Sequence, residues 1–268
     1  MNIKLKRKKR ALDYKKLQMF FSVAIVATVM IFSLPGQSKA KPAHSDGGWD
    51  FAAEVYFWGA SIGGDTATGT DVDIEIDDLI DGLNMAFMGS FGVKKERWAF
   101  MVDAIYLDSS DNTNINTRIG GVNTNVDLSS WIVTPMIGYE VLNSDKFSLT
   151  ILGGVRYLYL DTEIDLRNAD PAGPAFSFNG DDSGDNWDGI IGIMGDIEIA
   201  ANWYIPYHLD IGTGDSEFTW QGFTGIGYHF NHIDVLAGYR YLSWNFDDND
   251  VFDDMNLSGF MAGAKFYF

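Results

Sequence analysis

The sequence predicts an all-β chain that forms a transmembrane, antiparallel, up-and-down β-barrel of about ten strands, with 8 or 12 as the alternatives. Three observations lead to this fold. Beyond residue 40 the chain alternates apolar and polar residues, its connections alternate between short and long, and its aromatic residues gather at the ends of the alternating segments. Because successive side chains of a strand point to opposite faces, this alternation gives each strand one apolar and one polar face.

The first 40 residues have the order of a secretory signal peptide. Residues 1–16 are basic, residues 19–34 are apolar, and residues 38–40 place small side chains before an expected cleavage after Ala40. An uncleaved signal anchor is the alternative, although the apolar run is shorter than the roughly 20 residues of a spanning helix. We therefore expect an exported chain whose residues 41–268 form the barrel domain in the cell outer membrane.

Ten segments show the alternation. Between residues 98 and 106, for example, Trp98, Phe100 and Val102 share one face while Asp103 lies on the other. The expected strands cover residues 49–62, 83–93, 98–109, 124–142, 147–164, 187–199, 203–213, 217–230, 233–246 and 255–268.

The connections between these segments alternate in length. Short turns are expected at 94–97, 143–146, 200–202 and 231–232, and longer acidic loops at 63–82, 110–123, 165–186 and 247–254. The connection at 214–216 departs from the pattern, because it is short where a long loop is expected. Short periplasmic turns opposite long extracellular loops are typical of outer-membrane barrels, and an even number of strands places both termini on the periplasmic side.

A soluble β-sandwich also alternates, so the aromatic residues are needed to decide between the two folds. Aromatic girdles at both membrane interfaces are a barrel feature. The candidates are Trp49, Trp58, Trp98, Trp131, Tyr139, Trp187, Trp203, Tyr228, Trp244 and Tyr267. The ending Lys265–Phe268 also resembles the C-terminal recognition signal of outer-membrane barrels. The barrel-assembly machinery is therefore an expected partner through Phe268.

Several stretches resemble a widespread, largely uncharacterised family of small, porin-like outer-membrane β-barrel proteins of Gram-negative bacteria. They are Tyr56–Gly64, Leu83–Asp108, Trp203–Phe230 and Val235–Phe246, with Leu209–Ser216 and Thr219-Trp220 as the most specific part. The resemblance implies the barrel fold and the outer-membrane location. It implies no established activity or substrate.

Facing the apolar side of each strand to lipid places the polar side in the lumen, since a charged Arg or Lys at mid-depth on the lipid face costs about 2–4 kcal/mol. The expected lumen residues are Glu54, Asn84, Ser90, Asp103, Thr134, Glu140, Arg156, Asp188, Asp196, Glu198, His208, Asp210, Gln221, His229, Asp234, Arg240 and Lys265. We expect this lumen to be polar, acidic and mostly filled, because barrels of about eight strands are filled by side chains.

Two arginines occupy a repeated Gly-x-Arg-Tyr-Leu context, Arg156 and Arg240, at similar expected depth. Arginine keeps its charge, so each requires a carboxylate, and Asp103, Asp210 and Glu54 are the candidates. We expect a salt-bridge network that closes the lumen, with Arg240 and Asp210 among its pairs, while an ion pathway or a ligand cradle is the alternative. The candidate lumen network is Glu54, Asp103, Arg156, His208, Asp210 and Arg240.

Composition excludes several classes of function. The chain has no cysteine, which excludes disulfides and thiol chemistry, and its net charge of -18 argues against nucleic-acid binding. No cofactor or metal motif is present. The acidic loops could attract divalent cations, yet none has the spacing of a calcium loop. Outer-membrane lipid and lipopolysaccharide are the other expected partners.

The first functional hypothesis is a non-enzymatic barrel with a structural role, or with a narrow, cation-preferring, porin-like passage. The alternative is a surface-exposed binding or adhesion barrel that uses its acidic extracellular loops. A third hypothesis is a hydrolase at the barrel rim, because His208 and Asp210 lie two residues apart on one strand and a His beside a carboxylate can act as a base.

Overall fold

In the computed structural model, residues 48–66, 71–74, 83–117, 120–168, 177–246 and 252–268 are described. The expected signal peptide, residues 1–40, lies outside these ranges. No helix within the described ranges has the length and apolar character needed to cross a membrane, a result that does not bear on membrane β-barrels.

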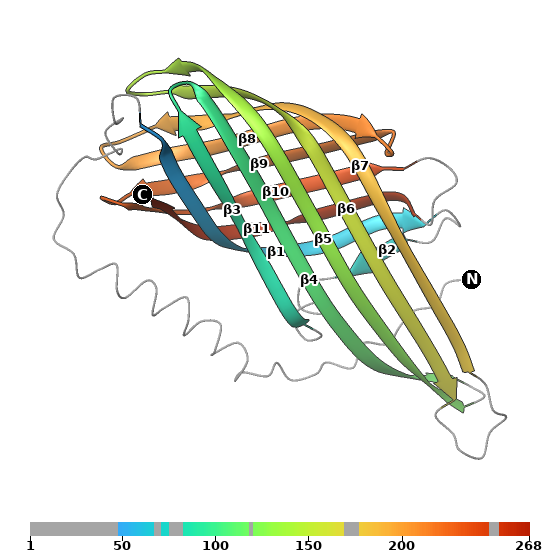
Figure 1. The fold of residues 1–268 in the computed structure, drawn as a ribbon. Coiled ribbons are helices and arrows are strands. Elements are labelled where there is room, and N and C mark those ends of the chain that lie inside the picture. Colours follow the sequence, from blue (N-terminus) through green and yellow to red (C-terminus); the bar gives the residue numbers. More distant parts are fainter. Residues whose placement is uncertain (1–47, 67–70, 75–82, 118–119, 169–176, 247–251) are drawn as a thin grey trace. The chain divides into compact units, whose positions relative to one another are not determined.

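Ten antiparallel strands form a closed barrel in which each strand pairs with its neighbour in the chain and the last pairs with the first (Figure 1). They are β1 (Asp50–Thr66), β3 (Leu83–Lys95), β4 (Trp98–Thr117), β5 (Gly120–Asn143), β6 (Ser148–Asn168), β7 (Ser177–Glu198), β8 (Trp203–Gly214), β9 (Phe218–His229), β10 (Ile233–Asn245) and β11 (Phe252–Tyr267). All ten expected strands are present, which confirms the predicted fold.

A short strand, β2 (Asp71–Ile74), was not expected. It pairs with the C-terminal part of β1, the upper part, which is the part farther from the short turns. The lower part of β1 pairs with β3 only as far as Val55 opposite Gly89. Three residues further along, the amide of Trp58 donates to the sulfur of Met88 at 3.2 Å rather than to a carbonyl of β3. The partner of β1 on this side therefore changes from β3 to β2 along the strand.

The outer wall of the barrel is apolar, as the alternation predicts. Large apolar side chains are exposed on every barrel strand, among them Phe57, Phe100, Ile151, Ile191 and Phe260. Cross-strand aromatic pairs lie on this wall, among them Trp98 with Tyr139, Trp203 with Tyr228, Tyr106 with Trp131 and Tyr157 with Trp187. The first two lie beside short turns and the last two toward the long-loop end, so the wall has an aromatic row at each end of its apolar band.

Three of the expected girdle aromatics point inward instead. Trp58 and Trp244 are buried, with 2% and 0% of their surface exposed, and Tyr267 donates its hydroxyl to Asp234 inside the barrel. The sequence interpretation was wrong for these rings because it relied on their position near a strand end. Their place in the alternation puts them on the same face as the charged lumen residues.

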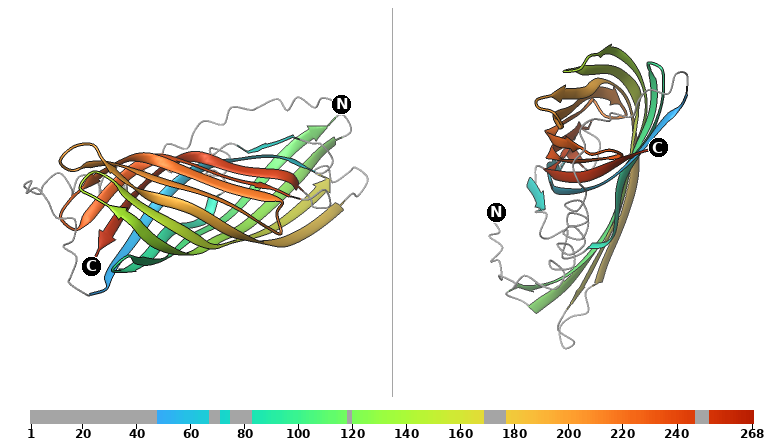
Figure 2. Two further views of the ribbon diagram at one scale, coloured as in Figure 1. Left: turned by 90° about the horizontal axis from the view of Figure 1, so that it is seen from above. Right: turned by 90° about the vertical axis from the view of Figure 1, so that its left-hand side faces the viewer.

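Strands β4 to β7 are longer than the other barrel strands, with 20, 24, 21 and 22 residues against 12 in the shortest and 17 in the longest of the rest. A membrane crossing takes about 9–11 residues. The four strands continue together past the other strands of the barrel (Figures 1 and 2). Most of the segments 110–123 and 165–186, expected to be loops, are thus strand; residues 118–119 and 169–176 lie outside the described ranges.

Three aromatic side chains mark where this extension begins. Tyr106 donates to Asp108 at 3.2 Å, Tyr159 to Asp161 at 3.5 Å and the indole of Trp187 to Asp185 at 3.0 Å. In each case the carboxylate lies two residues further from the short turns on the same strand face. Rings that combine an apolar body with a polar tip are favoured at a membrane interface, so this row marks the upper boundary of the apolar wall.

Candidate functional site

The middle of the lumen is crossed by Arg156, which projects from β6 and has no exposed surface. Its Nη2 lies 2.7 Å from Oδ1 of Asp210 on β8, and its Nη1 donates to Oγ1 of Thr219 on β9 at 3.0 Å. Thr219 in turn donates its hydroxyl to the carbonyl of Ser243 on β10 at 2.9 Å. Arg156 is thereby connected to three strands besides its own.

Arg240 fills the same level from β10. Its Nη2 lies 2.8 Å from Oδ2 of Asp103 on β4, and its Nη1 donates to the hydroxyl of Tyr56 on β1 at 2.9 Å. The guanidinium carbon lies 4.8 Å from the centre of the Trp58 ring, a distance typical of a cation–π contact. The Arg240 guanidinium is therefore in contact with a carboxylate, a hydroxyl group and an aromatic ring.

Gln221 on β9 connects the two arginines into one network. Its Oε1 accepts from Nε and Nη2 of Arg240 at 3.1 and 2.7 Å, and its Nε2 donates to Asp210 at 3.3 Å. His208 borders the same carboxylate, with Nε2 3.0 Å from Oδ2 of Asp210. The pairs are therefore Arg156 with Asp210 and Arg240 with Asp103. The expected pairing of Arg240 with Asp210 is wrong, because Gln221 lies between them.

A single row of directly opposed residues carries several of the lumen charges. Across β4, β3, β1, β11, β10 and β9 the register places in sequence Asp103, Ser90, Glu54, Lys265, Asp234 and His229. Directly opposed residues of an antiparallel pair point to the same face of the sheet. Because each residue of the row is opposed to the next, all six side chains point into the lumen. This explains why the inward residues of distant strands meet.

An apolar cluster fills the lumen beside the arginines, on the side away from the short turns. It includes Trp58, Trp244, Ile132, Leu158 and Leu242, all nearly inaccessible. The lumen is therefore less polar than the sequence analysis expected, because the inward face of the upper strand halves carries large apolar residues. Arg156 and Arg240 with their partners form an arginine layer across the lumen. Together with this layer, the apolar cluster fills the barrel at mid-depth, as is usual for narrow barrels.

The short connection at 214–216, the exception in the loop pattern, is bound to the neighbouring strand β7. Oδ1 of buried Asp188 accepts from the amide and the hydroxyl of Ser216 at 3.0 and 2.7 Å, and Oδ2 accepts from Asn186 at 2.6 Å. The amide of Trp187 donates to Asp215 at 2.9 Å. These contacts hold the short turn against β7.

A second polar group lies near the short-turn end. His229 contacts Asp234 through Nδ1 at 2.9 Å and Glu198 through Nε2 at 3.2 Å, and Asp234 accepts from Tyr267 at 2.5 Å. The ring of Tyr204 stacks on His229 with 4.1 Å between ring centres. A side chain on Gly227 would overlap the Tyr204 ring, so this stacking requires glycine there.

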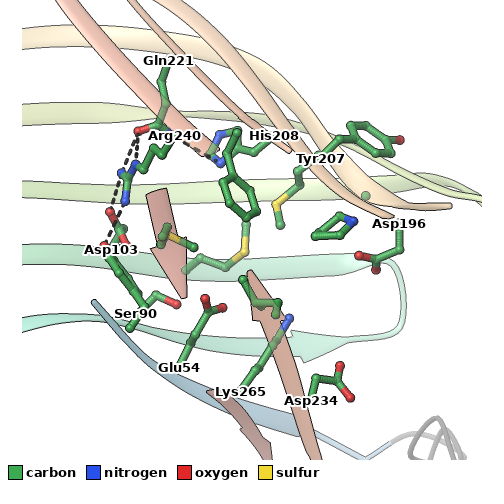
Figure 3. A pocket seen from close by; sticks show the side chains of 18 of the residues that line it. Glu54, Ser90, Asp103, Asp196, Tyr207, His208, Gln221, Asp234, Arg240 and Lys265 are labelled. Carbon is green, nitrogen blue, oxygen red and sulfur yellow. Dashed lines mark hydrogen bonds and ion pairs between the residues drawn. The ribbon is translucent and has the colours of Figure 1, made fainter. Parts of the chain in front are cut away.

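Between these two groups lies a cavity of about 170 Å³ (Figure 3). Its wall runs from Asp103 and Arg240 at mid-barrel to Tyr204 and Tyr267 near the short-turn end. Glu54, one of the predicted network residues, lies on this wall and not among the arginine contacts. It is opposed to Lys265 in the register, whereas Asp103, Arg156, His208, Asp210 and Arg240 meet in the network.

Neutral residues complete the network, and sequence reasoning gave them no part in it. Tyr56, Thr219 and Gln221 each contact an arginine. Their inward facing follows from the alternation, but a search for charged residues passes over them. Asn84 is also expected to face inward, but it is not among the residues whose side chains the structure describes.

The arrangement does not place a catalytic pair at the rim. Asp210 has no exposed surface, lies inside the lumen and is engaged by Arg156. Among the described residues no group of three or more His, Asp or Glu side chains could hold a metal ion. The predicted attraction of divalent cations concerns acidic loops that lie partly outside the described ranges.

Comparisons with known proteins find similarity only at the level of solved structures. No protein-family model matches this chain, and no curated protein matches it. The translocator domain of the autotransporter NalP from Neisseria meningitidis overlaps with a TM-score of 0.43 at 12% identity, over 94% of this chain and 96% of that one.

Two other outer-membrane proteins overlap less well. Ail, the attachment invasion locus protein of Yersinia pestis, gives a TM-score of 0.36 at 12% identity, over 83% of this chain and 99% of that one. The toluene transporter TodX of P. putida gives 0.34 at 10% identity, over 84% and 90%. At these values the similarity does not extend to a site or an activity.

Proposed function

We propose that this chain is a non-enzymatic outer-membrane barrel with a structural role, whose lumen is closed at mid-depth. The observation that carries the proposal is the Arg156–Asp210 pair, in which neither side chain has any exposed surface. Charged groups in an open, water-filled channel would be exposed to solvent. The apolar outer wall between two aromatic rows supports the outer-membrane location.

The partners proposed for this role follow from the same features. Outer-membrane lipid and lipopolysaccharide would surround the apolar wall, and the assembly machinery would recognise the C-terminal strand through Phe268. A porin-like passage remains part of the proposal only if the arginine layer opens. Such a passage would prefer cations, because carboxylates outnumber cationic side chains along the lumen.

The test is conductance of the purified, folded barrel in a planar lipid bilayer. The wild-type protein is expected to give no steady current steps, because side chains fill the lumen at the arginine layer. Folding is verified beforehand by heat-modifiable gel mobility. Steady, porin-sized current steps from the wild-type barrel would overturn the closed-lumen proposal.

A second candidate function is surface binding, and the four-strand extension of β4 to β7 favours it. These strands have about ten residues more than a membrane crossing needs, which at about 3.3 Å per residue is roughly 30 Å of additional strand. The extension includes Asp127, Glu163 and Asp181, which the register places directly opposite one another on β5, β6 and β7. Strand that continues this far past a membrane crossing supports a surface on which a partner could bind.

The binding candidate is tested by shortening the extension on both hairpins, with residues 111–126 and 164–180 each replaced by a short turn. Cells that display the shortened barrel should lose adherence to cell or matrix surfaces while retaining folded protein in the outer membrane. A second variant carries Asp127→Asn and Glu163→Gln; it removes two charges without shortening a strand and so separates the effect of charge from the effect of strand length. Unchanged adherence of the shortened barrel would eliminate this candidate.

A further inference from the structure

The cavity below the arginine layer carries a net negative charge. The acids on its wall are Glu54, Asp103, Asp196 and Asp234, and the cations are Arg240 and Lys265. Four carboxylates thus share this wall with two cationic side chains, of which Arg240 is paired with Asp103. Carboxylates on the low-dielectric wall of a cleft attract a cation and disfavour an anion.

Glu54 is the carboxylate best placed to receive a cation. Among the described residues it makes no hydrogen bond or ion pair within 4 Å, and its cross-strand neighbours are Ser90 and Lys265. Figure 3 shows Glu54 and Lys265 extending into the same space. Asp234, by contrast, already accepts from Tyr267 and contacts His229.

The rest of the wall is suited to an apolar body. Four methionines line the cavity together with Phe223 and Leu236; they are Met101, Met136, Met194 and Met261. Methionine side chains are flexible and adapt to ligands of different shape. Tyrosine rings also line the wall, among them Tyr204, Tyr207 and Tyr267, and an aromatic ring can face a cation.

The volume limits the size of the ligand. The cavity measures about 170 Å³, and a cavity of about 150 Å³ in another protein accepts benzene. A molecule with one ring or a short branched chain fits this space. The arginine layer and the apolar cluster fill the lumen above it, so such a molecule would reach the cavity from the short-turn side.

We propose that this cavity is a binding site for a small organic cation, a protonated amine with a ring-sized apolar group. The ammonium lies against Glu54, and the apolar group packs among the methionines and Phe223. The role goes beyond that of a closed structural barrel, since it assigns the lower half of the lumen to ligand binding. It depends on the cavity alone and not on any conductance.

The test is titration calorimetry of the folded wild-type barrel in detergent with benzylamine, using benzyl alcohol as the neutral counterpart of similar shape. Benzylamine should bind saturably, and benzyl alcohol about tenfold or more weakly, because only the amine forms a charge-assisted contact. Equal binding of the two compounds, or no saturable binding of benzylamine, would overturn the proposal. This comparison needs no variant.

Two variants locate the site. Glu54→Gln keeps the shape of the side chain and should weaken benzylamine about tenfold while leaving benzyl alcohol unchanged. Ser90→Phe fills the cavity without changing its charge and should abolish binding of both compounds. Glu217→Gln, on the exposed β8–β9 turn, is the matched control and should bind as the wild type does. Wild-type affinity in folded Glu54→Gln would refute the site, whatever the conductance of the barrel.

Discussion

Arg156 and Asp210 are 54 positions apart and lie on strands separated by β7, yet their side chains meet at 2.7 Å with neither exposed. The contact passes through the lumen behind β7, so it joins strands that share no backbone hydrogen bonds. A buried ion pair of this kind is costly to break, since removal of one partner leaves an uncompensated charge worth about 3–5 kcal/mol. It therefore favours the closed arrangement of the strands.

The pairing of the two arginines can be separated by double-mutant cycles on unfolding in detergent. Arg240→Ala should destabilise the barrel by about 3–5 kcal/mol, and adding Asp103→Ala should recover part of this loss. The cycle of Arg240→Ala with Asp210→Ala is the matched comparison and should show a smaller coupling, because Gln221 intervenes. Equal coupling in both cycles would contradict the observed pairing.

The anchored turn between β8 and β9 makes a separate prediction. Asp188→Asn removes a charged acceptor for the amide and hydroxyl of Ser216 and should cost about 1–3 kcal/mol of unfolding free energy. Ser216→Ala removes only the hydroxyl contact and should cost less. Chemical unfolding followed by tryptophan fluorescence measures both. A larger effect for Ser216→Ala than for Asp188→Asn would show that the carboxylate is not the anchor.

The part that the apolar cluster plays in closing the lumen can be tested by conductance. Trp58→Ala removes the buried ring that lies over Arg240, so Arg240 gains room to move and the arginine layer should open to small, cation-selective current steps in a planar bilayer. Phe100→Ala, on the lipid-facing wall, is the control and should leave the barrel non-conducting. If the Trp58→Ala current prefers anions, the carboxylates do not set the field of the lumen.

The C-terminal residue closes the barrel as well as ending the chain. Phe268 and Phe51 exchange two backbone hydrogen bonds of 3.1 Å, and their rings stack with 6.3 Å between centres. Deletion of Phe268 should lower the amount of folded protein in the outer membrane and leave precursor in the periplasm. Fractionation and immunoblotting measure this.

Phe268→Ala separates the two roles of this residue. It keeps the backbone bonds but removes the ring, so a yield as low as that of the deletion would assign the effect to aromatic recognition. A yield near wild type would assign the effect to closure of the seam. Normal yield of the deletion itself would contradict the predicted assembly signal.

The sequence determined the strands and the facing of most side chains. Both follow from a period of two, which is a local property that any ten-residue window displays. The apolar wall, the inward facing of Asp103, Arg156 and Arg240, and the positions of the short turns could all be predicted in this way. Strand ends were harder to place, because the polar extensions of β4 to β7 have the composition of loops.

Only the tertiary structure decided which inward residues meet. The alternation along each strand predicts that Arg240, Asp103 and Asp210 all face the lumen. The strand order and register decide that Arg240 pairs with Asp103 and that Gln221 lies between Arg240 and Asp210. The tertiary structure likewise buries Trp58 and Trp244 in the apolar cluster that fills the lumen, and it places Glu54 on the wall of a cavity. These outcomes depend on side chains from non-adjacent strands filling one closed volume, a condition that no local window of sequence contains.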